Sequence, residues 1–245
     1  MEKLFKDYEY EPQVYNFFIY PEERRDLVEY SKEIAEYLRS EGIQNLVIID
    51  RSSRPLYLGV REYFHAYYPH EKMPNIYFMN PKGFKSKEDL TPEEIEDIIR
   101  DCAWKSDAEE APHQVRSNEQ IMCEFQDTYK RLMADKKEPV LVFDTCIHRG
   151  RALESVKRAL DNSGFSDIRI GSVNPADPGA KVKTDFYITT KRPEKGCYPF
   201  DRDRIIEKTF DHVYSKKTTD PHKRTRSIQL RKEIKKIIRD SFKKQ

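Results

Sequence analysis

Residues 139–160, PVLVFDTCIHRGRALESVKRAL, join a short apolar run to a helical pattern through a polar turn. The run is short, branched and apolar, which predicts a buried strand that ends at Asp144. Gly150 closes the turn, and apolar residues then recur at helical spacing. A strand, a tight turn and a helix in this order aim several backbone N–H groups, and the positive end of the helix dipole, at one point. This arrangement favours an anion such as phosphate.

Asp144 adds a second feature to this turn. A carboxylate at the strand end can accept hydrogen bonds from neutral hydroxyls that lie just outside the anion. An anion site beside a hydroxyl acceptor describes a site for ribose 5-phosphate. The same pattern also occurs in α/β folds in which the turn binds nothing, so both interpretations stay open at this point.

Strands and helices alternate on either side of this stretch. Short apolar runs predict strands at residues 45–50, 75–80, 139–144, 167–173 and 184–190. Helical patterns are found at residues 22–41, from Pro55 to Pro69, and after two capping-box sequences at 91–94 and 117–120. This order predicts an α/β fold with a mainly parallel sheet flanked by helices. Ligands in such sheets bind at the carboxyl ends of strands. The polar turns DRSSRP (50–55) and DTCIHRG (144–150) follow two of those ends.

The charges are unevenly distributed along the chain. Residues 215–245 hold 12 Lys and Arg against 3 Asp and Glu, whereas residues 1–214 hold 33 against 40. The four cysteines form no CxxC pair, which argues against a zinc site and a disulfide framework and fits a reducing compartment. No stretch approaches the ~20 apolar residues that a membrane span requires. A soluble cytoplasmic protein without a membrane partner is therefore expected.

The basic segment 215–245 has an apolar face of its own. Leu230, Ile234, Ile237 or Ile238, and Phe242 share one side of the predicted helix, and Lys and Arg occupy the rest. Such a helix either packs on the body with its charged face in water or presents its cations to RNA or another polyanion. The sequence favours the first interpretation and keeps the second open.

The segment VLVFDTCIHRGRAL resembles the phosphoribosyl pyrophosphate (PRPP) loop of type I phosphoribosyltransferases. That family's pattern has four apolar residues, two acidic residues, three variable positions and then Thr-Gly. Asp144 and Gly150 fall on the first acidic residue and the glycine. Thr145 replaces the second acidic residue, and Arg149 replaces the threonine. Arg149 either meets the 5′-phosphate as a cation or obstructs the pocket.

Three further features extend the resemblance. The turn DRSSRP stands where the family keeps its pyrophosphate-binding loop, which implies this role for Arg51, Ser52, Ser53 and Arg54. Residues 81–137 stand in place of the mobile catalytic loop and are predicted to be a mostly helical insert. KGCYPFDRD (195–203) is similar to the late aromatic segment of purine-using members, which implies that Phe200, with its neighbour Tyr198, either stacks on the base or packs in the core.

The resemblance implies a phosphoribosyltransferase-like domain over residues 1–214 and a basic tail over 215–245. The expected reaction moves the phosphoribosyl group of PRPP to a nucleobase, purine-like, and releases pyrophosphate, with magnesium held mainly by the diphosphate. Asp144 and Thr145 would bind the ribose diol. The 5′-phosphate would lie against Cys146, Ile147, His148, Arg149, Gly150 and Arg151. His148 stands where purine-using members often carry a proton-accepting aspartate, so it is either the general base or a solvated turn residue.

A second interpretation of the same resemblance is a protein that binds PRPP or a nucleotide without turnover. The changes at Thr145 and Arg149 favour this regulator, which could bind RNA through its basic tail. The sequence also leaves open whether the chain forms a homodimer.

Overall fold

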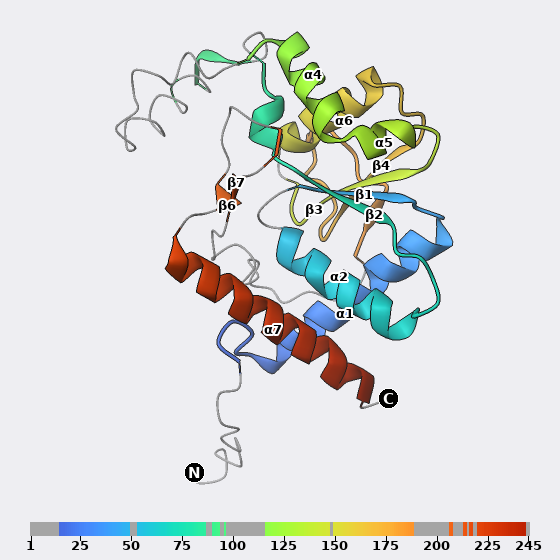
Figure 1. The fold of residues 1–245 in the computed structure, drawn as a ribbon, viewed down its shortest axis with the longest axis vertical. Helices are drawn as coiled ribbons and strands as arrows, with labels where there is room; N and C mark the ends of the chain where they lie inside the picture. Colours follow the sequence, from blue (N-terminus) through green and yellow to red (C-terminus); the bar gives the residue numbers. More distant parts are fainter. Residues whose placement is uncertain are drawn as a thin grey trace.

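The computed structural model describes residues 15–49, 53–86, 90–93, 96, 116–147, 149–188, 206–207, 213–214, 216–217 and 220–243. In this part of the chain, five strands form an all-parallel sheet in the order β2-β1-β3-β4-β5, with helices on both faces (Figure 1). The strands are β1 (Asn45–Ile49), β2 (Asn75–Met79), β3 (Val140–Asp144), β4 (Ile168–Ser172) and β5 (Phe186–Tyr187). A separate antiparallel pair joins β6 (Ile206–Glu207) to β7 (Lys216–Lys217). The predicted α/β class with a mainly parallel sheet is confirmed.

The helices follow the predicted order. They are α1 (Pro21–Ser40), α2 (Ser53–Tyr67), the short 3-10 helix η1 (Pro81–Phe84), α4 (Asn118–Thr128), α5 (Lys130–Ala134), α6 (Arg151–Asn162) and α7 (Pro221–Lys243). Helix α2 begins two residues earlier than the predicted start at Pro55. The capping sequence at 91–94 lies partly outside the described residues.

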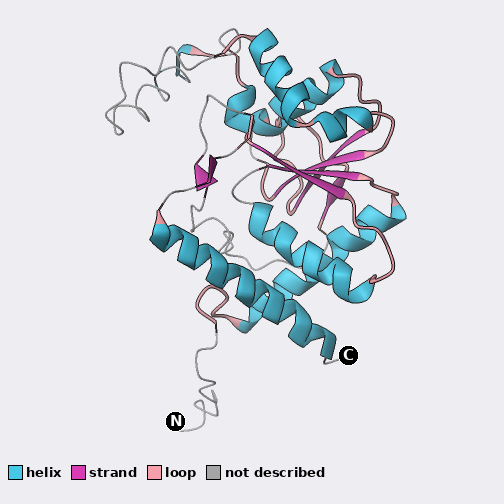
Figure 2. Cartoon of the chain, in the orientation of Figure 1, coloured by secondary structure: helices cyan, strands magenta, loops and turns pink. Residues whose placement is uncertain are grey.

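Strand residues alternate between two cores, one on each face of the sheet. In β1, Leu46 and Ile48 pack with α1, α2 and α7, whereas Val47 and Ile49 pack with α4, α5 and α6. Strand β3 divides in the same way, because successive side chains of a strand point to opposite faces. Both faces of the central strands are therefore apolar, which explains their continuous apolar sequence. Figure 2 shows the sheet between these two helical layers.

The capping box predicted at residues 117–120 is present at the start of α4. The Gln120 N–H donates to Ser117 Oγ at 3.3 Å, and the Ser117 N–H donates to Gln120 Oε1 at 3.0 Å. The predicted helical pattern after this box is divided in the structure into α4 and α5, which meet at Tyr129. The Tyr129 hydroxyl donates to the Phe78 carbonyl oxygen at 2.6 Å, so a contact with β2 accompanies the break.

Helix α7 packs on α1 and α2 through its apolar face. The expected residues Leu230, Ile234, Ile237 and Ile238 are buried, whereas Phe242 is 50% exposed. Near the end of the helix, the Phe242 ring meets the edge of Tyr67, with centroids 5.0 Å apart. In the middle, the buried Glu233 accepts hydrogen bonds from the Asn16 and Phe17 N–H groups, each at 2.9 Å. No helix in the described ranges is both long enough and apolar enough to cross a bilayer.

Two described parts of the predicted insert (residues 81–137) contact each other: the stretch 81–86 and the stretch that begins at Arg116. Arg116 donates to the Gly83 carbonyl oxygen at 2.7 Å and forms an ion pair with Glu124. Glu124 also accepts a hydrogen bond from the Val213 N–H at 3.0 Å. These contacts connect the residues before the segment 87–115 with the residues after it, on one side of the sheet. Most of that segment lies outside the described ranges.

Asp26 on α1 supplies a test of this packing. The side chain is 3% exposed, and burial raises the pKa of the Asp26 carboxyl, although Arg25 opposes the shift. Because the pKa of Asp26 is higher in the folded state than in the unfolded state, ionising this group costs more free energy in the folded protein. The free energy of unfolding therefore falls as the pH rises above the ordinary carboxyl pKa of about 4. We expect Asp26→Asn to raise the melting temperature by a few degrees at pH 7. The gain should shrink as the pH falls toward 4, as measured by thermal unfolding.

Asp127→Asn is the matched control, because the Asp127 side chain is 70% exposed and lies 3.5 Å from Lys130. It should give no comparable gain at pH 7. A gain for Asp26→Asn that stayed constant from pH 4 to pH 7 would contradict the assignment to ionisation.

Candidate functional site

The carboxyl ends of β1 and β3 meet at the point where the chain reverses its direction across the sheet. These two strands are parallel neighbours, with Ile48 opposite Phe143. Helix α2 leaves β1 on one face of the sheet and leads to β2, whereas α6 leaves β3 on the other face and leads to β4. Because the two connections leave on opposite faces, this edge is a topological switch point, which is where doubly wound sheets bind ligands.

Ser53 joins the two strand-end turns at this switch point. Its hydroxyl donates to Asp144 Oδ1 at 3.1 Å and accepts a hydrogen bond from the Thr145 N–H at 3.0 Å. The Thr145 N–H also lies 2.8 Å from Asp144 Oδ1. Ser53 is fully buried and Asp144 is half-buried. The structure thus brings Ser53 of the first predicted turn to Asp144 and Thr145 of the second, and it fixes one oxygen of the Asp144 carboxylate.

The turn from Thr145 to Gly150 is held by the segment that follows β4. The carbonyl oxygens of Ile147 and Arg149 accept hydrogen bonds from the N–H groups of Asp177 and Lys181, each at 3.1 Å. The Ile147 side chain is 2% exposed and packs in the core shared with α6, so only its backbone is available to a ligand at this turn. The segment after β4 therefore holds the turn at Ile147 and at Arg149.

Gly150 fits this turn for two separate reasons. Its φ of 71° lies in the left-handed region, and α6 begins at the next residue. A Cβ atom at position 150 would lie 3.0 Å from Val182 Cγ2 and 3.2 Å from the Lys181 and Val182 nitrogens. A side chain at this position would push the segment 181–182 away from the turn.

The predicted cations of the site lie in different surroundings. The Arg54 guanidinium stacks over the Phe78 ring of β2, with its carbon 3.8 Å from the ring centroid. Arg149 and Cys146 are exposed, so neither side chain is buried inside the turn. Arg151 is half-buried at the start of α6 and lines a pocket on the flank of that helix.

The other predicted site residues lie outside the described ranges. These residues are Arg51, Ser52, His148, Tyr198 and Phe200. Their roles at the pyrophosphate loop, the proton-transfer position and the base therefore stay predictions.

The structure adds polar groups to this edge that the sequence analysis did not single out. Asn80 follows β2, is fully buried, and accepts a hydrogen bond from the Lys82 N–H at 3.3 Å. Ser172 ends β4 opposite Asp144 and donates to the Asn174 carbonyl oxygen. The Asn174 side-chain oxygen is buried without a hydrogen-bond partner among the described residues. Polar residues at the ends of the apolar strands were the available signal.

No protein-family model matches this chain. No curated protein shows significant similarity to it. Because a fold alone does not determine function, the function is inferred from the residues at the site itself.

Gly150→Ala tests the close approach between the turn and the segment 181–182. Gly42→Ala is a matched control, because Gly42 has a φ of 62° and no atom within 4 Å of an added Cβ. The control should lose about 1–2 kcal/mol of unfolding free energy through backbone strain. Gly150→Ala should lose about 1–3 kcal/mol more through overpacking. Urea denaturation measures both losses, and equal losses in the two variants would contradict the close approach.

Proposed function

We propose that this chain is a divergent type I phosphoribosyltransferase that transfers the phosphoribosyl group of PRPP to a nucleobase, purine-like, with release of pyrophosphate. The observation that carries the proposal is the pair of hydrogen bonds that Ser53 makes to Asp144 and Thr145. They join the turn predicted to bind pyrophosphate to the turn predicted to bind ribose 5-phosphate, at the switch point of the sheet.

Each part of PRPP has a proposed place. The 5′-phosphate binds at the turn 145–150, beside the first turn of α6, where backbone N–H groups and the helix dipole favour an anion. The ribose hydroxyls donate to the Asp144 carboxylate, which is held in place through its Oδ1 atom by the Ser53 hydroxyl and the Thr145 N–H. The pyrophosphate lies along Arg51, Ser52 and Arg54, directly before and within the first turn of α2.

The reaction needs positioning more than covalent help. The bond between C1 of the ribose and the pyrophosphate oxygen breaks, and a bond from C1 to a base nitrogen forms. Positive charge grows on the sugar while negative charge grows on the departing pyrophosphate, so fixed groups that match these charges lower the barrier. His148 is the proposed acceptor of the base proton, and Phe200, beside Tyr198, is the proposed stacking partner of the base.

In this arrangement, magnesium would bind together with the substrate. Magnesium commonly binds substrate phosphates and water with one or two carboxylates, and Asp144 supplies a half-buried carboxylate at the strand end. Such an ion would neutralise charge on the departing pyrophosphate.

Nucleobases screened with PRPP and magnesium, with pyrophosphate release as the readout, test the proposal. We expect release with a purine base and none without a base. Asp144→Asn should weaken PRPP binding and lower kcat/KM by about 10–100-fold, because a hydrogen bond to a charged acceptor contributes about 1.5–3 kcal/mol. Asp161→Asn, on an exposed carboxylate 2.8 Å from Lys157 Nζ, is the control and should change neither value.

The result also separates the enzyme from the alternative regulator. Thr145 and Arg149 replace an acidic residue and a threonine of the family pattern, and these changes support binding without turnover. PRPP binding that depends on Asp144, without pyrophosphate release for any base, would select the regulator. Absence of both PRPP binding and release would contradict both proposals.

The position of α7 favours a second candidate function, binding of RNA. The apolar face of the helix is buried against α1 and α2, and its opposite face exposes Lys232, Lys235 and Arg239. A row of exposed cations on a docked helix can follow a phosphate backbone.

Replacing Lys232, Lys235 and Arg239 with Gln tests this candidate while leaving the buried face unchanged. The slope of log binding constant against log salt for a single-stranded RNA should become shallower by about 2, since each phosphate contact contributes about 0.7. The control changes Lys32, Lys130 and Lys157 to Gln, which removes the same charge from other helices. An equal change of slope in both triple variants would contradict a binding face on α7.

A further inference from the structure

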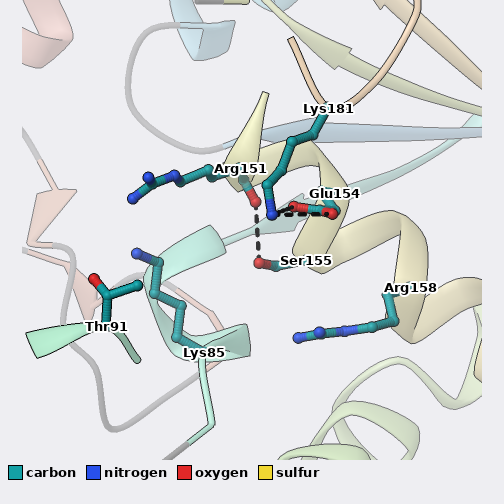
Figure 3. Close-up of a pocket in the computed structure, with 7 residues that line it drawn as sticks. All are labelled: Lys85, Thr91, Arg151, Glu154, Ser155, Arg158 and Lys181. Atoms are coloured by element: carbon teal, nitrogen blue, oxygen red, sulfur yellow. Dashed lines mark hydrogen bonds and ion pairs between the residues drawn. The ribbon is translucent and has the colours of Figure 1, made fainter. Parts of the chain in front are cut away.

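The hydroxyl of Ser53, the first residue of α2, forms its hydrogen bonds across the fold. A serine in a helix commonly bonds to a backbone group of the same helix. Figure 3 shows this usual case on α6, where the Ser155 hydroxyl donates to the Arg151 carbonyl oxygen at 3.0 Å. Ser53 Oγ instead contacts Asp144 and Thr145, which are 91 and 92 residues away along the chain.

The chemistry of the three groups sets the direction of each hydrogen bond. An ionised carboxylate only accepts, a backbone N–H only donates, and a serine hydroxyl has one proton to donate. The Ser53 proton is therefore directed at Asp144 Oδ1, and a lone pair of Ser53 Oγ receives the Thr145 N–H. The oxygens of a diphosphate are acceptors. A pyrophosphate would have to break the bond to Asp144 in order to receive the Ser53 proton.

Ser53 Oγ, the Thr145 nitrogen and Asp144 Oδ1 form a closed triangle. Its sides measure 3.1, 3.0 and 2.8 Å. Because a carboxylate is planar, two donors that hold Oδ1 also restrict where the second oxygen of Asp144 lies. Ser53 is fully buried, and hydrogen bonds are electrostatically stronger in such surroundings than in water. A change at Ser53 therefore acts on the carboxylate and on the first N–H of the turn 145–150.

We propose that Ser53 is a positioning residue for the ribose end of the site and not a ligand of pyrophosphate. The inference rests on the proposed function, and it gives Ser53 a different role from the one that the family resemblance implies. Through Asp144 and Thr145, the hydroxyl orients the acceptor of the ribose hydroxyls and the start of the phosphate-binding turn. It also sets the spacing between the two halves of PRPP, which pyrophosphate alone does not need.

Isothermal titration of the full chain with ribose 5-phosphate, and separately with pyrophosphate and magnesium, tests this role. Ser53→Ala should weaken ribose 5-phosphate binding by about tenfold, because hydrogen bonds to a carboxylate depend on its orientation. The same variant should leave the affinity for pyrophosphate unchanged. A direct pyrophosphate ligand at position 53 would give the opposite selectivity. Ser53→Cys fills a similar space with a weak donor, so it serves as a second variant with the same selective loss.

Two other serines provide matched controls. Ser155→Ala removes a hydroxyl that is bonded within α6, four residues after Arg151. Ser31→Ala removes a fully buried hydroxyl that has no hydrogen-bond partner among the described residues. Neither change should alter the affinity for either ligand. Thermal unfolding of all the variants checks that they are folded at the temperature of the titration.

A double-mutant cycle with Asp144→Asn separates positioning from a general effect on packing. If Ser53 acts through the Asp144 carboxylate, the two changes are coupled and their effects are not additive. Ser53→Ala should therefore weaken ribose 5-phosphate binding less in the Asp144→Asn background than in the unchanged chain. Equal losses in the two backgrounds would show that the hydroxyl does not act through Asp144, and would overturn the inference.

The titrations also distinguish this inference from the proposed function. Absence of ribose 5-phosphate and PRPP binding to the unchanged chain would overturn the proposed function and, with it, the role of Ser53. Equal ribose 5-phosphate binding by the unchanged chain and Ser53→Ala would overturn the role of Ser53 alone. A loss for pyrophosphate as large as that for ribose 5-phosphate would also contradict the inference, because positioning of Asp144 predicts a selective loss.

Discussion

The hydroxyl of Ser53 is the contact on which the candidate site depends. It donates a hydrogen bond to Asp144 Oδ1 and accepts one from the Thr145 N–H. The Ser53 side chain is fully buried. Without this hydroxyl, a buried carboxylate oxygen and a backbone N–H would each lose a partner that water could not easily replace. The contact also fixes the distance between the two turns, so the diphosphate and ribose positions proposed here depend on the same hydroxyl.

The sheet makes this contact available. Alternating apolar residues in β1 and β3 bury both faces, so the helices that follow the two strands leave on opposite sides. The parallel strands bring their carboxyl-end residues to one edge: Asn80 directly after β2, Asp144 at the end of β3 and Ser172 at the end of β4. Helix α7 covers the layer of α1 and α2, and Glu233 fixes residues 16 and 17 against it.

Local patterns were sufficient to predict most of the fold, because each depends on neighbours in the sequence. The helical pattern at residues 22–41 predicted α1, and the capping box at residues 117–120 predicted the start of α4. Contacts between distant segments were not predictable in this way. The break at Tyr129 accompanies a bond to Phe78, and α2 starts early at Ser53, which bonds to residues 144 and 145.

The central claim is that the turn after β3 binds the phosphate of a ribose 5-phosphate group while Asp144 accepts its hydroxyls. A crystal structure of the protein with ribose 5-phosphate tests this claim most directly. The account predicts phosphate density against the backbone of residues 145–150 and ribose hydroxyls within hydrogen-bond distance of the Asp144 carboxylate. An empty turn at saturating ligand, or an Arg149 side chain filling the phosphate position, would contradict it.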